Sequence, residues 1–363
     1  MSSMLKDSRP RSDRRVAITF GDPNGIGPEV ALRGAIAGRW PAAWKRILVG
    51  DRATADRLCA WLKLPRLPCL RLADPIPAPV SLWDPEGPSY RPAPGRIRAD
   101  AARASLAWLD AAVEAAMGGW FDAVVTGPIC KEGWQRAGGP HPGHTERLAE
   151  ITGARIFAML LVGGGLRVAL ATRHLPLARV PGALSRESIV ETTRLVWEAL
   201  PWLGVPGGTI AVCALNPHAG DGGLLGDEEA RIVRPAIQAL RRRGAPVEGP
   251  VPADVVFYRA IRGEFAAVVA LYHDQGLGPF KMVAFTTGVN VTLGLPIVRT
   301  SPDHGTAFDR AWKGGAEPGS MEAAIRLAFD LAGRPNPWRN AVRRGRVRFS
   351  ARASFAPYSP KWA

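Results

Sequence analysis

Three histidines each follow an apolar run that is typical of a buried β-strand. The runs Leu166–Ala171, Thr209–Ala214 and Ala266–Leu271 lead to His174, His218 and His273. In open α/β sheets, ligands bind outside the carboxyl ends of the strands. Neutral imidazole is a versatile ligand for transition metals, and three protein ligands leave one position open for a substrate. The sequence therefore predicts that these three histidines hold one metal ion.

Histidine by itself is weak evidence for a metal site. The chain has six, and all of them stand in stretches rich in Gly, Pro, Asn or Asp that we interpret as loops. A single histidine in such a loop is more often structural or merely exposed. The arrangement after three strands is what favours a metal. Asp274 and Asp221 are candidates for orienting the ligands from behind.

Cations and one amide form a second set of candidates. Lys131, Lys281 and Arg299 stand beside polar loops, where a phosphate or a carboxylate would need them. Each could equally be an ordinary surface cation. Asn290 lies inside an otherwise apolar run, Gly288–Arg299, and a buried amide needs partners. Thr145 and the neighbouring amides, at the start of an expected helix, could hold an anion.

The expected elements alternate between strands and helices. Strand Val16–Phe20 precedes the turn Gly21–Glu29, in which Pro28 suits the first turn of a helix ending near Ala37. Further strands are expected at Arg46–Asp51 and Asp122–Val125, and an irregular stretch from Leu64 to Pro94. One helix is expected to be capped by Asp100 and to run to Met117, and another to begin at Asp227 and to kink at Pro235. Two more helices are expected at Ser185–Leu200 and Ser320–Ala332. After His273 we expect a polar loop containing Gly276, Gly278 and Pro279. This alternation predicts an α/β fold of two lobes, with a largely parallel central sheet and the site between the lobes.

Composition limits the class of protein. The chain has 363 residues, of which 47% are hydrophobic and 22% charged, which is typical of a soluble globular protein. No apolar run is long enough to span a membrane, and residues 1–15 lack the apolar centre of a secretory signal. The four cysteines form no CxxC pair, so neither a zinc ribbon nor a disulfide framework is indicated. We expect a cytoplasmic protein.

A net charge of +15 could indicate a nucleic-acid partner. Residues 334–363 hold eight basic residues and no acidic one, and residues 1–15 hold five basic against two acidic. We therefore expect two solvated basic tails flanking one folded region at residues 16–333, and consider nucleic acid an unlikely partner. The dinucleotide fingerprint GxGxxG, a Walker loop and a serine nucleophile elbow are all absent.

These residues together resemble the PdxA family, the 4-hydroxythreonine-4-phosphate dehydrogenases of pyridoxal phosphate biosynthesis. The resemblance covers Val16 to Ala332 and rests on seven motifs in the family's order: Gly21–Glu29, Thr126-Gly127-Pro128 with Lys131, Gly143–Glu146, Asn216–Gly220, Tyr272–Gly276, Gly288–Gly294, and Arg299–Asp309. A wider similarity links the family to isocitrate and isopropylmalate dehydrogenases. They have a similar opening glycine loop and a loop like His304-Gly305-Thr306 near the nicotinamide cofactor.

The resemblance implies a set of site residues. It implies that His174, His218 and His273 bind a divalent ion (zinc, magnesium or cobalt) and that the substrate is contacted by His144, Thr145, Lys281, Asn290 and Arg299. Lys281 and Asp274 are the expected catalytic residues, and Asp303, His304, Gly305 and Thr306 are expected to bind NAD or NADP. The family is a homodimer whose site draws residues from both subunits, so the three histidines need not come from one chain.

The resemblance also implies an activity, the oxidation and decarboxylation of 4-phosphooxy-threonine to 3-amino-2-oxopropyl phosphate. Family members that act on four-carbon sugar-acid phosphates (4-phospho-threonate or 4-phospho-erythronate) are an alternative. Members that oxidise an aromatic cis-dihydrodiol are disfavoured, since Lys281 and Arg299 suit a phosphorylated substrate. Arg310 and Trp312 depart from the family's small or apolar residues, which leaves the choice between NAD and NADP open. A protein that binds polyanions through its basic tails is a remote alternative, and an inactive homologue fits poorly with the complete set of histidines and cations.

Overall fold

The computed structural model describes residues 14–72, 74–139, 141 and 143–339. Residues 1–13 and 340–363, which make up most of the two predicted basic tails, lie outside the described residues. The first strand begins at Arg15, one residue inside the predicted N-terminal tail. The described chain forms two compact units, one of residues 14–152 and 297–334 and the other of residues 153–296 and 335–339.

The first unit is built on a parallel sheet. Its strands, in their order across the sheet, are β3 (Val80–Trp83), β2 (Lys45–Val49), β1 (Arg15–Thr19), β4 (Ala123–Thr126) and β11 (Val298–Pro302). The central strands are apolar without alternation, as expected when helices cover both faces of a sheet. Val16, Ala17 and Ile18 are fully buried.

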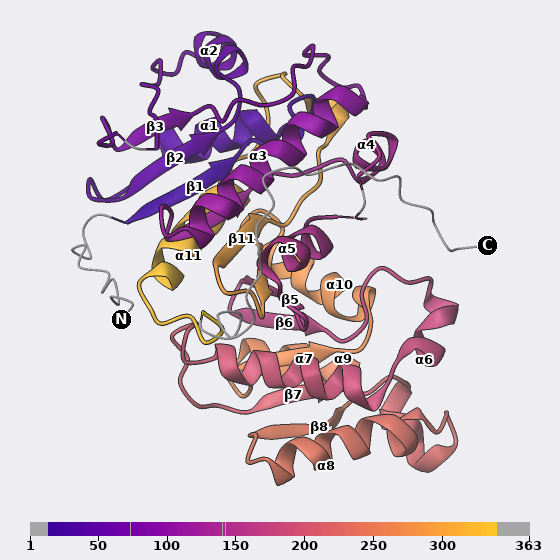
Figure 1. The fold of residues 1–363 in the computed structure, drawn as a ribbon. Helices are drawn as coiled ribbons and strands as arrows, with labels where there is room; N and C mark the ends of the chain where they lie inside the picture. The colour runs from indigo at the N-terminus through magenta and orange to yellow at the C-terminus, as the bar shows by residue number, and fades with distance from the viewer. Residues whose placement is uncertain (1–13, 73, 140, 142, 340–363) are drawn as a thin grey trace. The chain divides into compact units, whose positions relative to one another are not determined.

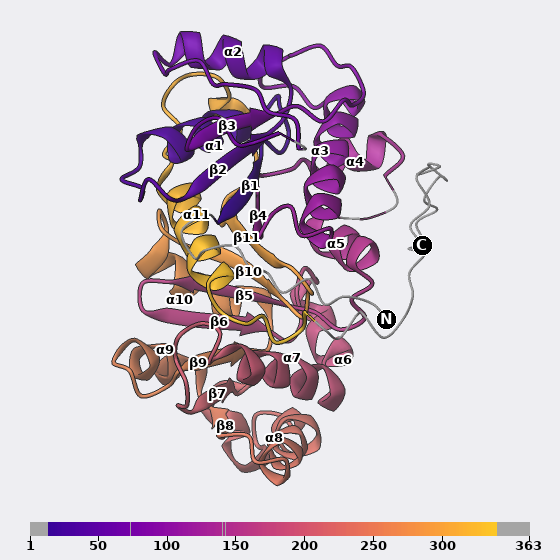
Figure 2. The same cartoon turned by 60° about the vertical axis from the view of Figure 1, so that its left-hand side comes forward.

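Helices cover the two faces of this sheet (Figures 1 and 2). The helices of the first unit are α1 (Gly27–Ala37), α2 (Arg52–Trp61), α3 (Ala99–Met117), α4 (Lys131–Arg136), α5 (His144–Thr152), the 3₁₀ turn η4 (Phe308–Arg310) and α11 (Gly319–Ala332). Helices α1 and α11 pack together on one face, and α3 packs with α4 and α5 on the other. Strands β1, β4 and β11 are adjacent and parallel, so the loops after them meet at one edge of the sheet.

The second unit has a mixed sheet. Across it lie β10 (Val289–Leu293), β5 (Ala158–Gly163), β6 (Leu166–Leu170), β9 (Ala267–Ala270), β7 (Ile210–Cys213) and β8 (Val247–Val251). Strand β5 runs antiparallel to both of its neighbours, whereas β6, β9, β7 and β8 are mutually parallel. The carboxyl ends of β6, β9 and β7 therefore lie at the same edge, as the sequence predicts for the strands that precede the three histidines.

The helices of the second unit also lie on both faces of its sheet. They are η1 (Leu177–Arg179), α6 (Val180–Ala183), α7 (Arg186–Ala199), η2 (Pro217–Gly223), η3 (Glu229–Val233, a π-helical segment), α8 (Arg234–Arg242), α9 (Ala253–Ile261) and α10 (His273–Ala284). Helices α9 and α10 each pack on β6 and β9, and α7 packs on these strands from the opposite face, with α8 beside it. The α/β fold with a largely parallel sheet is thus confirmed.

The stretch after His273 corrects the sequence analysis. The expected polar loop is helix α10, which contains Pro279 within it. Gly276 is present for close packing rather than for a turn. A Cβ atom at this position would lie 2.9 Å from Leu170 and 3.0 Å from both Ala270 and Val168. His273 begins α10 and His144 begins α5, so the prediction that all six histidines lie in loops is wrong for these two. His218 lies within η2, but its backbone angles there are not helical.

Other boundaries also differ from the predictions. The stretch expected to be irregular contains β3, and β5, β8 and α9 were not predicted. The N-cap of α3 is Arg98, and Asp100 instead lies in the first turn, where it pairs with Arg98. The helix predicted from Asp227 is the π-helical segment η3 followed directly by α8, and the change of helix type falls just before Pro235, the second residue of α8.

Candidate functional site

A buried arginine and a threonine connect two neighbouring strands of the first unit. Arg299 of β11 is 2% exposed, and its Nη2 donates a 2.6 Å hydrogen bond to Oγ1 of Thr126, the last residue of β4. Burial lowers the pKa of the Arg299 guanidinium to about 9, which leaves it charged at neutral pH. A buried positive charge is costly, so it favours an anion beside it.

His144 lies close to this charge. It begins α5, and its Nε2 atom is buried without a hydrogen-bond partner among the described residues. Burial first, and then the positive charges of Arg299 and Lys131, lower the pKa of His144 well below its ordinary value. The imidazole is therefore neutral, with two cations within electrostatic reach. A neutral ring nitrogen can serve as a hydrogen-bond donor or acceptor for a bound anion.

The ring of His144 is held by aromatic packing and by its helix. Trp134 of α4 meets it edge-on, with ring centroids 5.6 Å apart, and the Trp134 indole donates to Ser105 Oγ of α3 at 2.9 Å. Helix α5 is tied to α3 through Arg147, whose Nε donates to Asp110 Oδ1 at 3.0 Å. These contacts fix the direction from which His144 approaches the arginine. Thr145 is the second residue of the same helix.

The opening glycine turn packs against the loop that leads to Lys131. Gly21 has φ +70°, and a Cβ atom there would lie 2.2 Å from the carbonyl oxygen of Pro128. The same oxygen accepts a 2.8 Å hydrogen bond from the Asp22 amide. Close backbone approach explains why this turn requires glycine. The turn therefore lies beside the loop that follows Thr126, at the carboxyl edge of the sheet.

Asp22 is a residue whose environment the sequence did not reveal. It is fully buried. Its Oδ1 accepts from the Asn24 amide at 2.9 Å, whereas Oδ2 has no partner among the described residues. Burial raises the pKa of Asp22 to about 6. The turn motif contains the residue, but only the packing of the surrounding loops removes it from water.

The expected cofactor loop lies beside the same opening turn. The Thr306 carbonyl oxygen accepts from the Ile26 amide at 2.9 Å, and a Cβ atom at Gly25 would lie 2.8 Å from this oxygen. The Asp303 amide donates to Ser320 Oγ at 3.0 Å, and His304 Nδ1 lies 3.0 Å from the Gly305 carbonyl oxygen. A Cβ atom at Gly305 would meet nothing within 4 Å, so the loop leaves open space there. This backbone arrangement fits the approach of a nucleotide.

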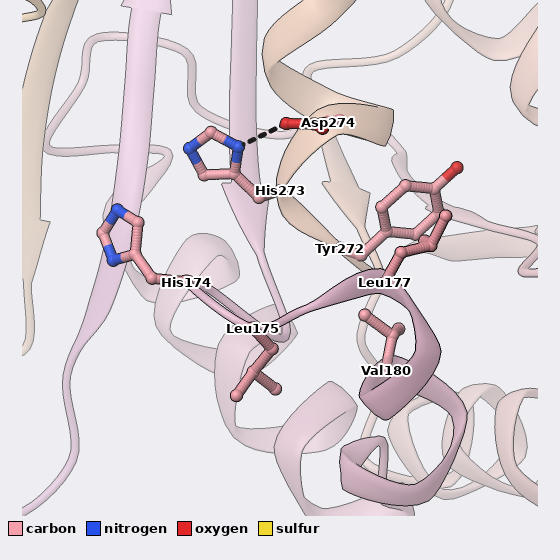
Figure 3. A pocket seen from close by; sticks show the side chains of 7 residues that line it. All are labelled: His174, Leu175, Leu177, Val180, Tyr272, His273 and Asp274. Atoms are coloured by element: carbon pink, nitrogen blue, oxygen red, sulfur yellow. Dashed lines mark hydrogen bonds and ion pairs between the residues drawn. The ribbon is translucent and has the colours of Figure 1, made fainter.

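Two of the three predicted metal ligands come together in the second unit. The rings of His174 and His273 have centroids 5.4 Å apart, and both line a pocket whose remaining walls are Leu175, Leu177, Val180, Tyr272 and Asp274 (Figure 3). Hydrogen bonds hold the two segments together beyond the strand ends, since Thr172 donates from both its amide and its hydroxyl to the Leu271 carbonyl oxygen. The two histidines thus come together because strand β6 pairs with strand β9.

Asp274 occupies the position expected of a residue that orients a ligand. Its Oδ1 lies 2.7 Å from His273 Nδ1. A carboxylate at Nδ1 fixes the tautomer in which Nε2 carries a lone pair, and that lone pair is what a metal requires. The donor chemistry of His174 and His273, with Asp274 orienting His273, therefore fits two of the ligands of a divalent ion.

His218 is not brought to this pair. It is exposed and lies in η2, where His218, Ala219 and Asp221 all have positive φ angles between 43° and 57°. The buried carboxylate of Glu229 supports the start of the segment by accepting from the amides of Leu215 and Asn216. Within the described residues, no group of three His, Cys, Asp or Glu side chains could hold a metal.

The predicted substrate contacts are divided between the units. His144, Thr145 and Arg299 belong to the first unit, and Lys281 and Asn290 to the second. Lys281 Nζ lies 5.5 Å from the centroid of the Phe285 ring. The Asn290 side chain has a buried Oδ1 without a partner among the described residues, in keeping with the expectation that this amide needs one.

Sequence reasoning also passed over Arg173, which directly precedes His174. Its guanidinium lies over the Phe157 ring at 4.8 Å, and its buried Nη1 has no hydrogen-bond partner among the described residues. The sequence feature that could have indicated Arg173 is its position between an apolar run and a predicted metal ligand.

Comparisons with known proteins identify the family. The family model described as "Pyridoxal phosphate biosynthetic protein PdxA" matches residues 44–328. A 4-hydroxythreonine-4-phosphate dehydrogenase of Desulfosudis oleivorans is 44% identical over 87% of this chain and 96% of its own length. A D-threonate 4-phosphate dehydrogenase of Pectobacterium atrosepticum is 39% identical, covering 87% of this chain and 99% of its own.

A solved structure gives the same result for the fold. The crystal structure of a 4-hydroxythreonine-4-phosphate dehydrogenase from Klebsiella pneumoniae superposes with a TM-score of 0.79 at 38% identity, covering 88% of this chain and 99% of that one. The α/β architecture and these relatives identify the chain as a metabolic enzyme of the dehydrogenase class. The chain belongs to the PdxA family.

Proposed function

We propose that the chain catalyses the NAD(P)-dependent oxidation and decarboxylation of 4-phosphooxy-threonine to 3-amino-2-oxopropyl phosphate, a step of pyridoxal 5′-phosphate biosynthesis. The observation that carries the proposal is the buried, charged Arg299 with Thr126 and the neutral His144 beside it. The names of the relatives, 4-hydroxythreonine-4-phosphate dehydrogenases at about two fifths identity or more, supply the substrate.

The cationic edge of the first unit would bind an anionic group of the substrate. Arg299 offers a guanidinium with fixed geometry, and Lys131 adds a second positive charge near His144. His144 would donate or accept one hydrogen bond without adding charge. Thr145, at the beginning of α5, would add its hydroxyl or backbone amide.

A divalent ion would be held by His174 and His273, with His218 completing the set in the homodimer. When bound, zinc, magnesium or cobalt supplies Lewis acidity. This acidity favours oxidation of the substrate hydroxyl to a ketone and the loss of carbon dioxide from the carbon atom next to that ketone. The role of Asp274 would be to hold the His273 tautomer. Lys281 would contribute a further cation for the substrate's second anionic group, and Asn290 a hydrogen bond from its buried amide.

The nicotinamide cofactor would bind at Asp303, His304, Gly305 and Thr306. The contact between Thr306 and the opening turn supports this placement, because the two loops together form a backbone surface at the carboxyl edge of the sheet. Glycine at 305 leaves room for a nucleotide to approach.

A homodimer is the proposed assembly, and the cytoplasm the proposed location. Helices α9 and α10 lie on one face of the second unit. Tyr258 of α9, Met282 of α10 and Phe285, which directly follows α10, are 65%, 87% and 74% exposed. Large apolar side chains gathered on one face favour burial against another chain. Among the described residues, no helix is long and apolar enough to cross a membrane.

A second candidate is the dehydrogenation of a four-carbon sugar-acid phosphate. It is favoured by the relative named D-threonate 4-phosphate dehydrogenase, which shares 39% of its residues with this chain. The anion site would serve this substrate as well, because the two substrate classes share the phosphate and the carboxylate.

The experiment that tests the proposal is turnover by metal-loaded protein with NAD and with NADP. The substrates are 4-phosphooxy-threonine, 4-phospho-threonate and 4-phospho-erythronate, and His218→Ala is the control. Turnover of the amino acid that is lost in the variant supports the proposal. Preference for a sugar-acid phosphate establishes the second candidate, and no turnover of any of the three refutes both.

A further inference from the structure

Trp312 is held in a backbone conformation that bulky residues rarely adopt. Its φ angle is +56°, in the left-handed region. Its indole Nε1 donates a 3.0 Å hydrogen bond to the carbonyl oxygen of Pro23, in the opening turn. Strained backbone of this kind persists only where the surroundings enforce it, and it concentrates at binding sites.

Two charged side chains of α1 enforce the strain. The buried carboxylate of Glu29 accepts from the amides of Gly314 and Ala316 at 3.3 and 3.0 Å. Arg33 Nη1 donates to the carbonyl oxygens of the same two residues at 3.1 and 2.9 Å. Four hydrogen bonds therefore fix the segment that follows Trp312, and the indole is presented on a rigid support.

Helix α2 adds an aromatic ring and a cation to this support. The Arg57 guanidinium lies over the Trp312 ring at 5.1 Å, and Trp61, which is 48% exposed, lies 3.4 Å from the position of a Cβ atom at Gly314. Flat rings with an adjacent guanidinium are the surfaces on which purine bases stack.

The cations around Trp312 differ from their neighbours in lacking acidic partners. Arg52 and Arg66 both pair with Asp56. Within the part of the chain that the structure describes, no ion pair or hydrogen bond joins Arg57, Arg310 or Lys313 to a carboxylate, and Arg57 and Arg310 are exposed. Cations without an acidic partner beside an aromatic surface suit an anion of the ligand.

This surface adjoins the loop proposed for the cofactor. Pro23, which accepts from Trp312, and Ile26, which donates to Thr306, belong to the same opening turn. The indole and Thr306 therefore both contact this one short turn. A dinucleotide bound at Thr306 would therefore lie along the turn that also holds Trp312.

We propose that Trp312, Arg57 and Arg310 bind the adenosine 2′-phosphate end of NADP, and that the chain uses NADP in preference to NAD. The adenine stacks on the indole, and the two guanidinium groups pair with the 2′-phosphate. NAD carries a hydroxyl at that position and leaves both guanidinium groups unpaired. The inference rests on the proposed use of a nicotinamide cofactor.

The test is calorimetric binding of 2′,5′-ADP and of 5′-AMP to the full chain without substrate. We expect 2′,5′-ADP to bind at least about tenfold more tightly. Arg57→Ala lowers the affinity for 2′,5′-ADP about tenfold and leaves that for 5′-AMP unchanged, whereas Trp312→Gly, which also relieves the strained backbone, weakens both. Arg66→Ala is the matched control, because Arg66 is already paired, and it changes neither.

Equal affinity for the two nucleotides overturns the inference, and so does an Arg57→Ala variant that binds 2′,5′-ADP as tightly as the unaltered protein. Displacement of 2′,5′-ADP by a short mixed-sequence oligonucleotide at equal phosphate concentration would show a general polyanion surface and would also overturn it. Turnover of 4-phosphooxy-threonine is measured separately. Normal turnover with NAD and no selective binding of 2′,5′-ADP refutes this inference alone. Selective binding without turnover of any phosphorylated substrate refutes the proposed function alone.

Discussion

Arg299 and Thr126 join two parallel strands through a side-chain hydrogen bond of 2.6 Å, with the guanidinium almost wholly buried. The two residues are 173 positions apart in the chain, and they meet because β11 pairs with β4. The buried guanidinium places a positive charge beside a neutral histidine whose Nε2 is buried without a partner among the described residues, and such a pair suits an anionic substrate.

Replacing Arg299 by methionine should lower kcat/KM about 10- to 100-fold, because a hydrogen bond to a charged group contributes about 1.5–3 kcal/mol. Steady-state kinetics with 4-phosphooxy-threonine measure the effect. Arg46→Met is the matched control. Arg46 is also buried in the first unit, burial lowers its pKa to about 10, and its Nη1 bonds to the Ala35 carbonyl oxygen. Equal losses in the two variants would show that Arg299 acts through stability alone.

His144 should remain neutral throughout the physiological range. Burial and the charges of Arg299 and Lys131 hold its pKa well below the ordinary value, so its ring resonances should not shift between pH 6 and pH 8 in an NMR titration. His144→Gln, which keeps a neutral hydrogen-bonding group, should retain more activity than His144→Ala. A ring that titrates near pH 6.5 would contradict the electrostatic description of the site.

Asp22 should make the protein less stable as the pH rises. Its pKa is about 6 in the folded protein against an ordinary value of 3.8, so the folded state binds more protons between these values and the free energy of unfolding falls as pH increases through them. The shift of about two units corresponds to about 3 kcal/mol at most. Asp22→Asn should therefore be more stable than the unaltered protein at pH 8 and no different below pH 4, as measured by urea unfolding.

Asp56 serves as a control, because its pKa is shifted in the opposite direction. Hydrogen bonding from Arg66 lowers the pKa of Asp56, so Asp56→Asn should lose stability at neutral pH, an effect that disappears on acidification. If Asp22→Asn behaved like Asp56→Asn, the buried carboxylate would have a stabilising partner.

Metal affinity should depend on the pair of histidines and on Asp274. His174→Ala and His273→Ala should each abolish tight binding of zinc, and Asp274→Asn should weaken it about 10- to 100-fold, as is usual for a carboxylate that orients a ligand. Competition with a chelator measures the affinity. His141→Ala serves as control, since His141 pairs with Glu150 and was not predicted to bind metal. Unchanged affinity in Asp274→Asn would show that its contact with His273 is incidental.

Much of the fold could be predicted from local patterns. Apolar runs of strand length predicted β1, β4, β6, β7 and β9, and the helix predicted at Ser185–Leu200 is α7, which Ser185 caps. The hairpin of β5 and β6 had a signal that was not used. Gly164 and Gly165, both with positive φ, separate two apolar runs, as in a tight hairpin turn.

What could not be predicted depends on packing between distant segments. Gly276 and Pro279 suggested a loop after His273, because the sequence does not show that Gly276 lies against β6 and β9. The adjacency of His174 and His273 followed from strand ends, but the separate position of His218 depends on the positive φ angles of η2. The strained Trp312 was noted only as an unusual residue, because its anchoring by Glu29 and Arg33 is a tertiary property.

The measurement that tests the account most directly is the dependence of turnover on the substrate's phosphate. The kcat/KM of metal-loaded protein is compared for 4-phosphooxy-threonine and for 4-hydroxythreonine, which lacks the phosphate, in the unaltered chain and in Arg299→Met. We predict a large preference for the phosphorylated compound that shrinks in the variant. Comparable turnover of both compounds by the unaltered protein would contradict the assignment of the buried cationic site to a phosphorylated substrate.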